Sequence, residues 1–123
     1  MQLNHINLTV ADVSKTRTFF ETYFGLKRIF ESGDSLAVLA DDNKHCIVAL
    51  NNFDKATKVA YPKGFHIGFF QESRQQVDAI FERLKADGFE LGQRKEFDGA
   101  WTFYFESPGG FTIEVAHRQV AGN

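Results

Sequence analysis

The stretches that decide the fold are Asn4-His5-Ile6-Asn7-Leu8-Thr9-Val10 and Phe65-His66-Ile67-Gly68-Phe69-Phe70. Each is a short β-type run with a histidine in its second position, and each leads into an amphipathic stretch. Gly25 and Gly88 close those stretches, 20 and 22 residues after the two histidines. The chain therefore contains an internal duplication, in which two similar units follow one another.

Working outward, the same order of elements is expected in both halves. Alternating apolar and polar residues predict strands, and apolar residues at helical spacing predict one helix per half. The strands are expected at 3–10, 26–31, 35–40, 46–50, 66–71, 89–95, 101–106 and 111–117, with helices ending near Phe24 and spanning 73–87. This order predicts an α+β fold of two paired β-α-β-β-β modules. One domain, 1–123, would hold module 1 (about 1–52), a linker (about 53–63) and module 2 (about 64–118).

Composition excludes several classes of function. The net charge is −2 and no basic stripe is present, so nucleic acid is not an expected partner. The apolar runs are far shorter than the roughly 20 residues of a membrane span, and the N-terminus carries no signal-peptide pattern. Cys46 is the single cysteine, which excludes an intrachain disulfide and fits a reducing cytoplasm. The 14 phenylalanines suit a core or a lined cavity.

Three residues carry the candidate chemistry: His5, His66 and Glu114. A histidine alone on a strand is most simply a hydrogen-bonded core or surface residue. Glu114, however, lies within the apolar strand 111–116, where a buried carboxylate needs a cation, an arginine or water to compensate its charge. With histidines at matched positions in both halves, a metal ion compensates that charge most economically. Two imidazoles and one carboxylate suit Mn, Fe, Co, Ni or Zn, and three ligands leave coordination positions open.

The chain resembles the vicinal oxygen chelate superfamily, which includes glyoxalases, bleomycin-resistance proteins and extradiol dioxygenases. The motifs that carry the resemblance are the opening 5–13, the helix end Phe19-Phe20…Phe24-Gly25-Leu26, and Phe103-Tyr104-Phe105…Pro108-Gly109-Gly110-Phe111-Thr112-Ile113-Glu114. The resemblance implies a curved, cup-shaped mixed sheet with helices on the outside, and metal ligands at His5, His66 and Glu114. The family's fourth ligand position falls near Val48. Glyoxalase I and methylmalonyl-CoA epimerase carry a carboxylate or an amide at that position, so the valine counts against both activities.

The ligand pattern is most similar to that of fosfomycin-resistance-type members. That similarity implies substrate-binding roles for Asn7, Arg94 and Tyr104, although Asn7 stands where the thiol transferases have a threonine. Trp101 and Tyr104 have opposite parity on one strand, so only one of them can face a ligand, and the resemblance favours Tyr104.

Together these features predict a divalent-metal-dependent enzyme (a lyase, transferase or dioxygenase) that acts on a small oxygen-containing substrate. The alternative is a metal-free small-molecule or drug-binding protein of the bleomycin-resistance type. A homodimer with shared sites is expected, in which His5 of one chain joins His66 and Glu114 of the other. The sequence carries no glycine-rich phosphate loop.

Overall fold

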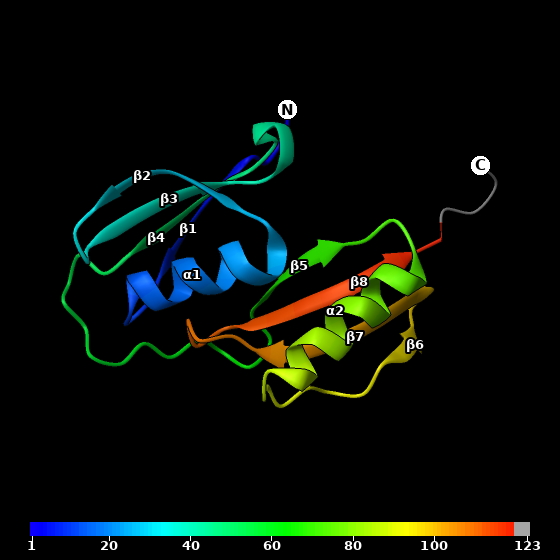
Figure 1. Cartoon of the computed structure of the whole chain (residues 1–123). Helices are drawn as coiled ribbons and strands as arrows, with labels where there is room; N and C mark the ends of the chain where they lie inside the picture. The colour runs from blue at the N-terminus through cyan, green and yellow to red at the C-terminus, as the bar shows by residue number, and fades with distance from the viewer. Residues whose placement is uncertain (120–123) are drawn as a thin grey trace. The chain divides into compact units, whose positions relative to one another are not determined.

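A computed structural model describes residues 1–119, which fold into two units that each contain a β-sheet and an α-helix (Figure 1). The elements are β1 (His5–Thr9), α1 (Val13–Phe24), β2 (Lys27–Ser32), β3 (Leu36–Ala40), the 3-10 turn η1 (Asp42–Lys44), β4 (Ile47–Asn51), β5 (His66–Phe70), α2 (Arg74–Ala86), β6 (Lys95–Phe97), β7 (Ala100–Glu106) and β8 (Thr112–Arg118). The predicted α+β fold of two β-α-β-β-β modules is confirmed, and each module forms its own four-stranded mixed sheet.

The first unit has the strand order β1-β4-β3-β2, with β1 parallel to β4 and the other neighbours antiparallel. Helix α1 packs on one face of this sheet (Figure 1). The Asp12 side chain caps the helix by accepting a hydrogen bond from the Lys15 amide at 2.9 Å. Gly25 ends it at φ 67°, a left-handed conformation that costs glycine little.

Alternation along the strands divides the first sheet into a packed face and an open face. The packed face lies under α1 and holds the buried residues Leu8, Val10, Ala37, Leu39, Val48 and Leu50. On β1, His5 and Asn7 point the other way and are exposed. The open face is therefore the one that presents the polar side chains predicted from the sequence.

The second unit repeats this arrangement with the strand order β5-β8-β7-β6. Ser73 caps α2 by accepting from the Gln76 amide at 3.1 Å. The helix packs on β7 and β8, where Phe81 meets the fully buried Phe103 edge to face at 5.1 Å between ring centroids. Thr102 and Tyr104, which alternate with the packed residues, lie on the face away from α2.

The strand expected at 89–95 is wrong for most of its length, because β6 begins only at Lys95. The segment before β6 lies beside β7. There the Gly92 amide donates a hydrogen bond to the Tyr104 carbonyl oxygen at 2.9 Å. A Cβ on Gly92 would lie 2.9 Å from that same carbonyl oxygen. Close approach of two backbones, rather than a ladder of strand hydrogen bonds, therefore shapes this segment.

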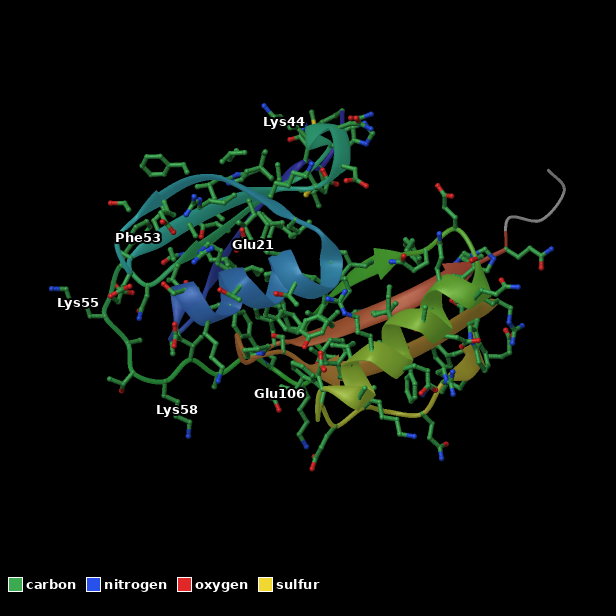
Figure 2. All side chains as sticks on the ribbon, in the orientation of Figure 1. Glu21, Lys44, Phe53, Lys55, Lys58 and Glu106 are labelled. Atoms are coloured by element: carbon green, nitrogen blue, oxygen red, sulfur yellow. The ribbon has the colours of Figure 1, made fainter. Side chains whose placement is uncertain are left out.

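The described residues divide into two compact units. The first unit comprises residues 1–60 together with the turn 108–110, and the second comprises the remaining described residues. The turn belongs to the first unit because Gly110, at φ 87°, approaches Val59 so closely that a Cβ would lie 2.9 Å from its carbonyl oxygen. Lys55 and Lys58 extend from the strand-free segment that follows β4 (Figure 2).

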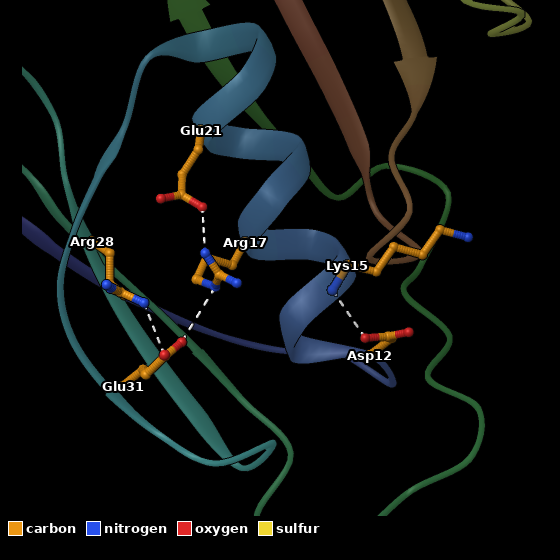
Figure 3. A network of polar contacts seen from close by, with 6 residues as sticks. All are labelled: Asp12, Lys15, Arg17, Glu21, Arg28 and Glu31. Carbon is orange, nitrogen blue, oxygen red and sulfur yellow. Dashed lines mark hydrogen bonds and ion pairs between the residues drawn. The ribbon is translucent and has the colours of Figure 1, made fainter.

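A network of charged side chains joins α1 to β2 (Figure 3). Arg17 pairs with Glu21 at 2.6 Å, and its Nε lies 3.4 Å from Glu31, which also pairs with Arg28 at 2.8 Å. The Nε contact has an ion-pair distance but not hydrogen-bond alignment. The Arg17–Glu21 and Arg28–Glu31 pairs are hydrogen-bonded, so the network combines two directed hydrogen bonds with one longer contact between charges.

Neither helix in the described part of the chain is long and apolar enough to cross a membrane.

Candidate metal and ligand site

The second sheet brings His66 and Glu114 together on its open face. His66 begins β5, and Glu114 lies in the middle of β8 with Gly68 and Tyr104 as its neighbours on the adjacent strands. The His66 Nε2 lies 3.6 Å from Glu114 Oε1. The Glu114 side chain is only 18% exposed, whereas His66 is 42% exposed. The carboxylate is thus held in the sheet while the imidazole reaches it from the edge strand.

The second oxygen of Glu114 is fixed by a residue that the sequence analysis missed. The hydroxyl of Thr102, which is fully buried, lies 2.8 Å from Glu114 Oε2 and 3.1 Å from the Val115 carbonyl oxygen. Both neighbours are hydrogen-bond acceptors, so the single hydroxyl hydrogen is shared between them. Thr102 therefore holds the carboxylate in one orientation and leaves Oε1 beside His66.

Tyr104 completes this cluster. Its ring meets His66 edge to face at 5.6 Å between centroids. Burial raises the pKa of the Tyr104 phenol, and the hydrogen bond it donates to Glu114 and the negative charge of that carboxylate raise it further. The phenol therefore stays protonated at neutral pH and serves as a hydrogen-bond donor.

Gly68 leaves space at the open side of Glu114. A Cβ at this position would lie 3.8 Å from Glu114 Oε1, and no side chain of residue 68 fills that volume. The residue lies between His66 and Phe70 on the same face of β5, so the space adjoins both candidate ligands. The absence of a side chain at residue 68 therefore leaves this side of Glu114 Oε1 uncovered by β5.

The first sheet presents His5 and Asn7 on its own open face. His5 is paired in register with Ile47, and Asn7 with Ala49. Val48 pairs with Ile6 and is buried on the helix side, so Ile47, Ala49 and Asn51 are the β4 residues on the open face. Ile47 and Ala49, the neighbours of Val48, have no side-chain atom that could bind a metal, so the predicted fourth ligand position holds no ligand.

Arg94 is not brought together with Tyr104 and Glu114. Its guanidinium pairs with Asp78 at 3.1 Å and Glu82 at 3.4 Å, and stacks on Phe81 at 4.1 Å, all on α2. Trp101 also faces α2, where its indole N–H donates to Asp78 at 2.9 Å. The predicted opposite orientations of Trp101 and Tyr104 are confirmed.

The residues of this site fit a divalent cation. An imidazole nitrogen and a carboxylate oxygen 3.6 Å apart, beside a glycine, form part of a borderline-metal donor set. Across residues 1–119, no group of three His, Cys, Asp or Glu side chains comes together. Two of the three predicted ligands are therefore assembled in the second unit, and His5 lies in the first.

Two such modules, each with a mixed sheet under one helix and polar side chains on the other face, define an α+β fold of paired β-α-β-β-β units. Residues 2–115 match the profile of the Glyoxalase/Bleomycin resistance protein/Dioxygenase superfamily. The chain belongs to this superfamily, as the sequence motifs predicted.

Three relatives illustrate its range. A structure described as a possible glyoxalase from Bacillus cereus has a TM-score of 0.83 and 51% identity, covering 94% of this chain and 97% of its own. The 2,2',3-trihydroxybiphenyl dioxygenase of Sphingomonas paucimobilis is 30% identical over 98% of this chain, which spans only 43% of that enzyme. The fosfomycin resistance protein FosX of Listeria monocytogenes is 30% identical over 85% of this chain and 80% of its own.

A mutant of FosX from Listeria monocytogenes has been solved with Mn(II) and dihydroxypropylphosphonic acid. That structure has a TM-score of 0.79 at 24% identity and covers 97% of this chain and 93% of its own. The superfamily thus includes members named for oxygenation and for drug resistance.

Proposed function

We propose that this chain is a divalent-metal-dependent enzyme that acts on a small oxygen-containing substrate, with His5, His66 and Glu114 as the metal ligands. The observation that carries the proposal is the pair formed by His66 Nε2 and Glu114 Oε1, 3.6 Å apart on an open sheet face. A largely buried carboxylate with one oxygen fixed by Thr102 is costly without a cation. Its orientation toward an exposed imidazole supports a shared metal ion.

His5 is the third ligand in this proposal, supplied by the other chain of a homodimer. It occupies the first position of β1, as His66 occupies the first position of β5. Both histidines are exposed and both begin an edge strand that runs parallel to its neighbour. The equivalence of the two positions supports a site that takes one histidine from each module.

Three protein ligands leave coordination positions for substrate. A metal held there would polarise a substrate oxygen or bind dioxygen, whichever of the lyase, transferase and dioxygenase chemistries the enzyme performs. Tyr104, whose ring lies against His66, would contact the bound substrate, and Asn7 would contact it from the first module. Arg94 would bind an anionic group only after leaving Asp78 and Glu82. The reducing cytoplasm remains the proposed compartment.

Metal content and affinity test this proposal. Protein purified without a histidine tag or chelator should hold about one equivalent of Mn, Fe, Co, Ni or Zn per chain by ICP-MS. His66→Ala, His5→Ala and Glu114→Gln should each weaken Mn²⁺ binding by about a hundredfold or more in calorimetric titrations. His45→Ala is the matched control, because His45 is exposed and precedes β4. No metal in the wild-type protein, and none taken up on titration, would overturn the proposal in favour of a metal-free ligand-binding protein.

A further inference from the structure

Asn51 is a buried polar side chain that the proposed function does not use. It ends β4 on the open face of the first sheet, in register with Thr9, and is 9% exposed. Its Nδ2 lies 2.5 Å from Asn7 Oδ1, and 3.4 Å from both the Leu8 carbonyl oxygen and Thr9 Oγ1. Its Oδ1 accepts a hydrogen bond from the Phe53 amide at 3.4 Å.

Two of these partners fix which way the Asn51 amide points. A backbone carbonyl can only accept a hydrogen bond, and a backbone amide can only donate one. Rotating the Asn51 amide by half a turn would set its oxygen against the Leu8 carbonyl and its NH₂ group against the Phe53 N–H. The Asn51 NH₂ group must therefore point toward Leu8 and Asn7.

The orientation of Asn51 in turn fixes that of Asn7. Because Asn51 offers a donor, Asn7 must turn its oxygen inward to accept it. The Asn7 NH₂ group then points away from Asn51, and within residues 1–119 it meets no acceptor. Asn7 is exposed and shares its face of β1 with His5, so its two free N–H groups lie beside a proposed metal ligand.

We propose that Asn51 is a positioning residue that sets Asn7 as a hydrogen-bond donor, so that the ligand group bound there is an acceptor oxygen. Carboxylate, phosphonate and carbonyl groups fit this polarity, whereas an ammonium group does not. The inference rests on the proposed function, in which Asn7 faces the substrate.

Amide exchange tests the orientation without any metal or ligand. In ¹⁵N-labelled protein, the side-chain NH₂ of Asn51 should exchange slowly with solvent and that of Asn7 quickly. Asn52, whose NH₂ group bonds to the Ala11 and Ala56 carbonyls at 3.0 Å, is the protected reference. In Asn51→Asp the donor is lost, so Asn7 should rotate and its NH₂ group should become protected. Fast exchange at Asn51 with slow exchange at Asn7 in the wild-type protein would overturn the proposal.

Binding of methylphosphonate to the Mn²⁺-loaded protein tests whether Asn7 donates a hydrogen bond to an acceptor oxygen of the ligand. Asn51→Asp should weaken it about tenfold, since an outward Asn7 oxygen would face the anion. Asn7→Asp is the second variant: it keeps the bond from Asn51, preserves folding and also presents an oxygen, so it should weaken binding similarly. Both losses should persist from about 50 mM to about 500 mM NaCl, because salt screens a change of charge but does not replace a donor.

Three binding results would also overturn the inference: wild-type affinity in Asn51→Asp, a loss that disappears at high salt, or no methylphosphonate binding by the loaded wild-type protein. If the wild-type protein takes up no metal, the proposed function fails, and amide exchange still decides the orientation of Asn7. The two failures are therefore distinguishable.

Discussion

The hydroxyl of Thr102 lies 2.8 Å from Glu114 Oε2, on the carboxylate oxygen that does not face His66. Thr102 is fully buried and Glu114 is largely so, which makes this contact resistant to competition from water. One carboxylate oxygen is thereby committed to the sheet. The other, Oε1, is the oxygen that a cation shared with His66 would meet.

Removing the Thr102 hydroxyl should loosen this arrangement. Thr102→Val keeps the shape of the side chain but leaves Oε2 without its donor, so Mn²⁺ affinity should fall about tenfold. The free energy of unfolding should fall by about 1 kcal/mol, and Thr102→Ser should restore both values. Calorimetric titration and urea unfolding measure the two effects. Unchanged Mn²⁺ affinity in Thr102→Val would show that the hydroxyl does not position Glu114.

Gly68 should govern access to the carboxylate rather than the stability of the fold. A Cβ there meets the neighbouring strand at 3.7 to 3.8 Å, an ordinary contact distance, so Gly68→Ala should fold normally. Replacing a strand glycine should even stabilise the chain by about 0.5 kcal/mol. The added carbon, however, occupies space beside Oε1, so Mn²⁺ affinity should fall for Gly68→Ala and further, by about tenfold, for Gly68→Val. Higher thermal stability with lower affinity is the expected pair of results, and unchanged affinity in both variants would contradict it.

The sequence predicted the parts of the molecule that depend on local pattern. Alternation and the two histidines predicted both modules, and Glu114 was identified because a carboxylate inside an apolar strand is costly. Thr102 and Asn51 were missed because their partners lie across strands, at positions that depend on register. Thr102 could have been found from its spacing, because it lies two residues before Tyr104 on the same strand. Both side chains therefore lie on the sheet face that carries Glu114.

One expected strand was wrong, and Arg94 makes contacts that the sequence did not indicate. Residues 89–94 alternate like a strand, but only Lys95–Phe97 pair with β7. Arg94 was assigned to the substrate by resemblance, yet Asp78 and Glu82, one turn apart on α2, hold its guanidinium. Both outcomes depend on how a helix and a backbone segment pack across the sheet, which periodicity does not specify.

Cys46 should react slowly at neutral pH. Burial raises the pKa of its thiol, and the negative charge of Asp41 raises it further. Less thiolate is therefore present than in the unfolded chain, and iodoacetamide should alkylate the folded protein more slowly than the protein in urea. A rate equal to that of the unfolded chain would contradict this prediction.

The raised pKa of Cys46 also makes the free energy of unfolding depend on pH. Because the folded-state pKa lies above the unfolded value, the folded protein holds this proton more tightly. The resulting stabilisation is complete below about pH 8.5 and is lost as pH rises through the folded pKa. Urea unfolding across this range should show the decline, and Cys46→Ala should lack that part of it.

Mixed dimers should decide which chain supplies His5. If His5 of one chain joins His66 and Glu114 of the other, neither His5→Ala nor Glu114→Ala alone should hold metal. In a heterodimer of the two variants, one site would carry both changes and the other would be intact. After random exchange of subunits about half of the dimers are mixed, so ICP-MS should find about one metal ion per four chains. If each chain kept its own three ligands, every site in the mixture would lack one, and heterodimers confirmed by mass spectrometry would hold no metal.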